Sequence, residues 1–217
     1  MSAKGGEQTL VARGREQRGH VVEWGNVELG RLPPMDRLVP GRECGGCTVC
    51  CRVLPIDSVD FQKQSGVLCH HSEDGVGCSI HASRPSVCRE WYCGWRVLPN
   101  LGDDWRPDRS EILIVPEYDD IPSSFVERPG LKFILSGSHA AALQPRFVKY
   151  LAALVDADIP VFLALPGPAE HFFAKAFLNH KLKDAAMRRD GGAIVASLRQ
   201  IIDVLSSGTF EKVVLRN

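Results

Sequence analysis

The segment Cys44-Gly-Gly-Cys47-Thr-Val-Cys50-Cys51 opens a stretch of fifty residues that contains every cysteine of this 217-residue chain. The remaining thiols follow at Cys69, Cys78, Cys88 and Cys93. Thiols gathered this densely form either a disulfide framework or a metal site, and the redox compartment decides between the two. Cysteines so close in sequence rarely reach the Cα separation that a disulfide needs, so the spacing favours metal.

The rest of the sequence favours a reducing compartment. The first eight residues, Met1-Ser-Ala-Lys-Gly-Gly-Glu-Gln, lack the apolar region of a secretory signal. The longest apolar runs, such as residues 150–155, fall far short of the roughly 20 residues that a membrane helix needs. We therefore expect a cytoplasmic protein with no membrane partner, in which thiols stay reduced unless they are catalytic or bound to metal.

The charge balance argues against nucleic acid as a partner. Lysine and arginine number 26, aspartate and glutamate also number 26, and the formal net charge is zero. No part of the chain carries the concentrated basic charge with which proteins bind phosphate backbones. The partners that remain are a metal ion and another protein.

Composition divides the chain into three parts. Residues 1–40 form a polar N-terminal segment that we expect to be partly disordered, apart from a short strand at 21–24. Residues 41–106 form a cysteine-rich module with little periodicity and one short predicted helix at 58–65. Residues 107–217 contain no cysteine and show the apolar patterns of an α/β region.

The predicted fold is α+β or a small α/β, with an irregular, metal-stabilised module packed on a small mixed sheet with two or three helices. Apolar runs predict strands at 112–115, 132–135 and 161–165, and helical periodicity predicts helices from Pro145 to 155 and over 194–205, with a shorter one at 172–178. The strand–helix–strand order indicates a βαβ unit. We expect the module to contact the edge of the sheet through Trp95, Val97 and Leu98.

The spacing of the thiols is that of metal-binding knuckles. Two cysteines separated by two residues can reach one ion while the backbone between them turns. Cys50 and Cys51 are adjacent, so their side chains start in different directions and need not serve the same ion. The eight thiols could fill two four-coordinate sites, or one site with ligands to spare, and Arg52, Arg84 and Arg89 could offset the negative charge.

This arrangement resembles the YkgJ-like cysteine-cluster family, whose CxxCxxCC domain is described as zinc- or iron-chelating. The matching residues are the run 44–51 with Arg52 after it, the Cys78-Ser-Ile segment, the Arg84-Pro85 pair, and Cys88-Arg89 with the remaining cysteines. His81 departs from the family, which often has an aromatic residue there. The resemblance covers about residues 41–95 and implies that the metal ligands are Cys44, Cys47, Cys50, Cys51, Cys69, Cys78, Cys88 and Cys93.

The thiols are compatible with both zinc and iron. All-thiolate tetrahedral sites suit zinc, which is the metal we expect first. The first three cysteines have the spacing of bacterial ferredoxins, although the fourth follows too soon, and the flagellin lysine methylases are similar in this cluster and associated with iron–sulfur. The alternatives are therefore an iron–sulfur (4Fe-4S) enzyme with a substrate pocket in the C-terminal region, or a zinc-stapled module that binds a protein.

Other residues are weaker candidates. His70, His71 and His81 could ligate zinc but are more often second-shell or surface groups, and Trp91, Tyr92 and Trp95 more often wall off a metal site than form a stacking platform. Ser136-Gly-Ser138-His139 is predicted to contain a helix-capping serine. The chain has no Walker loop, dinucleotide-binding glycine motif or HExxH motif, so no particular reaction is indicated and catalytic residues stay unknown.

Overall fold

A computed structural model describes residues 32, 37–125 and 129–216 of the chain, so the strand predicted at 21–24 lies outside the described residues. It is a mixed α/β structure centred on one sheet of four strands in the order β5-β6-β7-β8. These strands are Ile112–Glu117, Gly130–Leu135, Val161–Leu165 and Ala174–Phe177. The pairs β5–β6 and β7–β8 are antiparallel, whereas β6–β7 is parallel.

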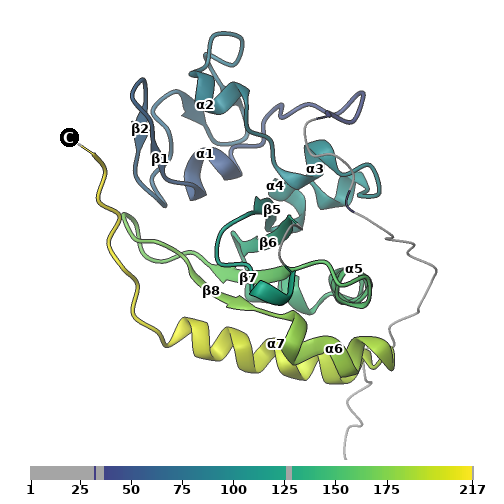
Figure 1. Cartoon of the computed structure of the whole chain (residues 1–217). Coiled ribbons are helices and arrows are strands. Elements are labelled where there is room, and N and C mark those ends of the chain that lie inside the picture. Colours follow the sequence, from purple (N-terminus) through teal and green to yellow (C-terminus); the bar gives the residue numbers. More distant parts are fainter. Residues whose placement is uncertain (1–31, 33–36, 126–128, 217) are drawn as a thin grey trace, which may run out of the picture.

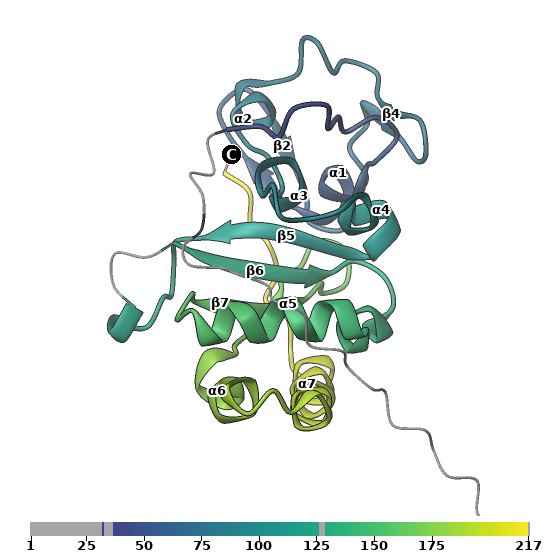
Figure 2. The same cartoon turned by 90° about the vertical axis from the view of Figure 1, so that its right-hand side faces the viewer.

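The parallel pair confirms the predicted βαβ unit. Helix α5, Pro145–Asp156, connects β6 to β7 and begins with Pro145 in its first turn, where a missing N–H costs nothing. Helices α6, Asn179–Met187, and α7, Gly191–Ser206, follow β8, and α7 begins where the Asp190 side chain accepts a hydrogen bond from the N–H of Ala193. The three helices cover one face of the sheet (Figure 2).

Two predicted helices are strands instead. Residues 172–178 contain β8, which pairs with β7 because its small alanines face the helices while Lys175 and Phe177 alternate to the other face. Residues 58–65 belong to a hairpin of β1, Ile56–Asp57, and β2, Gln62–Lys63. Ser58 closes its turn, because its N–H and its hydroxyl both donate to the carbonyl of Phe61. Ser58 is thus a turn residue, and no helix begins there.

The rest of the module consists of short elements above the sheet (Figure 1). They are α1 Val49–Val53, β3 Ser72–Glu73, β4 Gly77–Cys78, α2 Ser86–Arg89, α3 Gly94–Val97 and η1 Asp103–Trp105, and helix α4, Pro107–Ser110, follows the module and leads into β5. Two 3-10 turns, η2 Ser123–Phe125 and η3 His139–Leu143, lie in the sheet's connections. Within the described residues, none of the helices is long and apolar enough to cross a membrane.

The module wraps around the edge strand β5. On the face of the sheet opposite the helices, Val53 of α1 packs with Leu113 and Val115 of β5 and with Ile134 and Ala164 of the next strands. On the other side of β5, α3 delivers three side chains that are at most 5% exposed into the main core: Trp95, Val97 and Leu98. The predicted contact through these three residues is confirmed, and a second contact over the face of the sheet adds to it.

Candidate metal centre

The eight cysteines line one cavity. They come from α1, from the loop before it, from the β3–β4 hairpin region, from α2 and from the residue before α3, yet all eight border a space of about 690 Å³ between the module and the sheet. None of the eight is part of a disulfide. Fifty residues of irregular chain thus fold so that every thiol faces the same interior.

Close backbone contacts bring the first knuckle to the hairpin. A Cβ atom on Gly46 would lie 2.3 Å from the carbonyl oxygen of Gly75, and one on Gly77 would lie 2.4 Å from that of Gly45. Gly77 also has a φ of 115°, which L-residues avoid. Only glycine allows the 44–47 loop to sit directly on the turn that carries Cys78.

The charges of neighbouring thiols shift the pKa values of Cys93 and Cys50. Burial raises the pKa of Cys93 to about 11, and the negative charges of Cys44 and Cys47 act in the same direction. The pKa of Cys50 is also raised, first by its hydrogen bond with Cys51 and by burial, and then by charges that include Cys93 and Cys44. These charges relate Cys93 to Cys44, Cys47 and Cys50, although the thiol charge that acts most on Cys50 is that of its neighbour Cys51. We call Cys44, Cys47, Cys50 and Cys93 the first quartet.

The other four thiols form a second group. Burial raises the pKa of Cys88, and the charges that reinforce this effect are those of Cys51, Cys69 and Cys78. Cys69 is nearly buried, and its N–H donates to the carbonyl of Cys51, which ties the two segments together. We call Cys51, Cys69, Cys78 and Cys88 the second quartet.

Cys50 and Cys51 connect the two quartets. As consecutive residues of α1 they leave the helix axis about 100° apart, so each can face a different group. The hydrogen bond between their sulfurs lowers the pKa of Cys51 to about 6 while it raises that of Cys50. One turn of helix therefore contributes one thiol to each quartet.

A buried lysine lies beside the thiols. Lys63 of β2 is 6% exposed, and its ammonium group donates to the carbonyl oxygens of Arg52, Gln64 and Val67 at 3.1, 2.8 and 2.8 Å. Burial lowers its pKa to about 8, whereas the charges of Cys69, Cys51 and Cys50 favour the protonated form. Within the described residues no carboxylate forms an ion pair with it. The negative charge that would compensate Lys63 is that of thiolates.

The three arginines expected to offset this charge are placed differently. Arg84 lines the cavity, where its Nε donates to the carbonyl of Cys88 at 2.8 Å. Arg52 forms an ion pair with Asp74, which also accepts a hydrogen bond from Thr48. Arg89 is exposed. Arg84 therefore faces the thiols, and Lys63, which the sequence analysis did not single out, is the most buried cation there.

The histidines and aromatic residues divide in a similar way. His71 and His81 line the cavity, with Nε2 of His81 2.5 Å from Arg84, whereas His70 is exposed. Trp91 and Tyr92 also line it, whereas Trp95 belongs to the core. Away from the cavity, Ser138 accepts a hydrogen bond from the N–H of Ala140, which confirms the predicted capping role.

The cavity continues past the thiols to the sheet. Lys132 and Lys175 border it and point from the face that the module covers. Both lie close to Glu117, whose Oε2 is 2.8 Å from the ammonium of Lys132 and 3.6 Å from that of Lys175. These lysines were not predicted from the sequence to border a site, although charged residues at the inward positions of otherwise apolar strands are a visible signal of one.

The quartets are neighbourhoods and not closed coordination shells. In the part of the chain that the structure describes, no three or more Cys, His, Asp or Glu side chains are placed so that they could hold one ion. The donor set nevertheless suits a thiophilic metal, because each quartet consists of four thiols and a buried cation lies beside them. Rotation of the thiols inward would accompany metal binding, which commonly completes the folding of such modules.

No family model, curated protein or solved structure matches this chain, so the resemblance described above rests on the eight thiols and their spacing.

Proposed function

We propose that this chain is a metal-binding protein that holds two ions, one in each cysteine quartet, and that the metal is zinc. The observation that carries the proposal is that all eight thiols line one cavity, which is the number needed for two four-coordinate sites. Zinc accepts four thiolates in tetrahedral geometry, and a bound ion of this kind contributes its binding free energy to folding. A cytoplasmic location keeps the thiols available for it.

The protein's own charges support this assignment. A zinc ion with four thiolates has a formal charge of −2, which a buried site must balance. Lys63 and Arg84 provide positive charge on the side of the second quartet. A buried ammonium group that lacked such a partner would be costly, so the position of Lys63 favours thiolates over neutral thiols.

Metal analysis of variants tests the proposal. Elemental analysis of protein purified without oxygen should find about two zinc ions per chain. Cys93→Ser should remove one, Cys88→Ser should remove the other, and the double variant should remove both. Val59→Ser, a change at a fully exposed position of the same module, is the matched control and should keep both. Metal-free protein with all thiols in disulfides would overturn the proposal. So would a parent protein that holds one ion and loses it in either single variant.

An iron–sulfur centre is the second candidate, because the cavity is larger than bare ions require. A cluster adds inorganic sulfide and several irons to the four thiolates, and a cavity of about 690 Å³ has room for it beside either quartet. The chain would then suit an iron–sulfur enzyme. An anaerobic preparation would be brown with broad visible absorption, whereas colourless protein with stoichiometric zinc excludes this candidate.

A further inference from the structure

The cavity is larger than the thiols can account for. A zinc ion lies about 2.3 Å from each sulfur, so two such sites fill little of a space of about 690 Å³. Beyond the cysteines, the cavity extends along the β1–β2 hairpin and over the sheet, where its walls are mainly apolar. Six of the side chains there are Leu54, Ile56, Phe61, Trp91, Phe172 and Phe173. We call this part the sheet-side lobe.

The lobe contains two partly buried lysines, whose carboxylate partners differ in burial. The side chains of Lys132 and Lys175 are 17% and 29% exposed, and they share the carboxylate of Glu117, which is 4% exposed. Lys175 lies nearer to Asp120, at 2.8 Å, but the side chain of Asp120 is 73% exposed, and an exposed ion pair of this kind is worth little, so the acid group of a ligand can replace it. Glu211, at the mouth of the cavity, is likewise exposed. Two partly buried cations thus face one buried anion.

We propose that the sheet-side lobe is a binding site for a small organic anion with an aromatic or other apolar body. The acid group would meet the ammonium groups of Lys132 and Lys175, and the body would lie among Trp91, Phe172 and Phe173. The size of the cavity and its few charged groups among apolar walls are those of small-molecule sites. The 44% exposure of Phe172, unusual for a phenylalanine, is explained if a ligand covers it. This inference goes beyond metal binding and does not depend on it.

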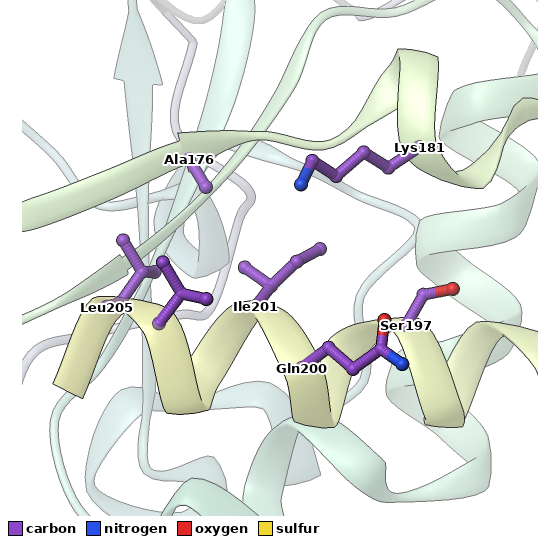
Figure 3. A pocket seen from close by; sticks show the side chains of 7 residues that line it. Ala176, Lys181, Ser197, Gln200, Ile201 and Leu205 are labelled. Atoms are coloured by element: carbon purple, nitrogen blue, oxygen red, sulfur yellow. The ribbon is translucent and has the colours of Figure 1, made fainter. Parts of the chain in front are cut away.

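A second hollow serves as the internal control. It lies on the opposite side of the molecule, between β8, α6 and α7, and measures about 400 Å³ (Figure 3). Lys181, Gln200 and Ser197 border it, together with Val204, which is 69% exposed. It has one exposed lysine and no buried charge, so it offers an apolar surface without selectivity for anions.

The test uses two fluorescent probes that share their rings. The probe 1-anilinonaphthalene-8-sulfonate carries an acid group, and N-phenyl-1-naphthylamine is its neutral counterpart. The purified full chain should bind the sulfonate in a saturable, 1:1 manner, and 3-phenylpropanoate should displace it whereas 3-phenylpropanol should not. Lys132→Met or Lys175→Met should weaken sulfonate binding about ten-fold and leave the neutral probe unchanged. Both lysine variants are measured, because either one could disturb folding, and circular dichroism shows which of them is folded.

Two further variants locate the probe. Phe172→Ser, at an exposed position on the rim of the lobe, should weaken both probes, whereas Val204→Ser should affect neither. The proposal is overturned if no saturable binding occurs, if both folded lysine variants bind the sulfonate as well as the parent does, or if Val204→Ser removes binding.

Discussion

Lys63 shows how one residue can report on the charge of its neighbours. An ammonium group that is 6% exposed is stable only if its donors and its charge are both satisfied. Three backbone carbonyls take its hydrogens, but carbonyls are neutral, and the groups that favour its protonated form are Cys69, Cys51 and Cys50. The lysine and the thiols therefore form one electrostatic unit, in which metal-bound thiolates would replace the missing carboxylate.

Replacing this lysine should weaken metal binding more than it weakens the fold. In Lys63→Met, the second quartet loses a positive charge, and at an effective dielectric constant near 20 that interaction amounts to about 1–2 kcal/mol. We expect zinc affinity, measured by competition with a chromophoric chelator, to fall roughly ten-fold for one of the two ions. Lys181→Met, at an exposed position on α6, is the control and should bind both ions normally. Unchanged affinity in Lys63→Met would remove the electrostatic role.

At the scale of elements, the module is held to the sheet by the close approach of α3 to β5. Gly94, the first residue of α3, lies so near β5 that an added Cβ would be 2.6 Å from Cγ2 of Ile114. The residue before it is Cys93 of the first quartet. Packing of a helix against an edge strand thus sets the position of a candidate ligand.

A single methyl group at this contact should disturb both fold and site. Gly94→Ala forces α3 away from Ile114, and overpacking of this kind typically costs about 1–3 kcal/mol of unfolding free energy. Urea denaturation should show that loss, and metal analysis should show weaker binding of the first ion because Cys93 moves with α3. Gly192→Ala in the first turn of α7, where the added Cβ meets only Asp190 at 3.5 Å, should be neutral or stabilising. Equal stability of the two variants would contradict the role of this contact.

At the scale of the whole molecule, the cysteine module and the sheet share their core. Leu101 and Trp105 lie with α3 in the same apolar cluster as the helices, although they precede the start of the predicted α/β region at residue 107. The C-terminal segment joins the layers from the other side: Phe172 donates to Glu211, Val213 donates to Glu170, and Arg216 pairs with Asp57 of the hairpin. Figure 1 shows this segment rising from α7 to the module.

Metal removal should therefore loosen only part of the module. After chelation we expect faster amide hydrogen exchange over residues 44–90, where backbone order depends on the thiols, and continued protection over 95–105 and in the sheet. Mass spectrometry of peptic fragments, with and without chelator, measures this directly. Simultaneous loss of protection everywhere would show that the metal sits at the centre of a single cooperative unit.

The periodic part of the fold was predictable from sequence. The strands near 112, 132 and 161 and the helices near 145 and 194 follow from long apolar patterns that depend on the local chain alone. Residues 58–65 and 172–178 were mispredicted as helices because their strands are only two and four residues long. Such short strands exist through their partners, β1 across a tight turn for β2 and β7 for β8, and too few residues remain to show an alternating pattern.

The candidate metal centre, like the fold, was predictable from sequence only in part. The sequence by itself determined the thiols and their knuckle spacing, and it indicated that Cys50 and Cys51 need not serve the same ion, because adjacent side chains start in different directions. Only the tertiary structure decided that all eight line one cavity, that Lys132 and Lys175 border the same cavity, and that the charge of Lys63 lies close to Cys69, Cys51 and Cys50. The physical reason is that burial and charge act through space, between residues whose separation in sequence carries no information about their distance.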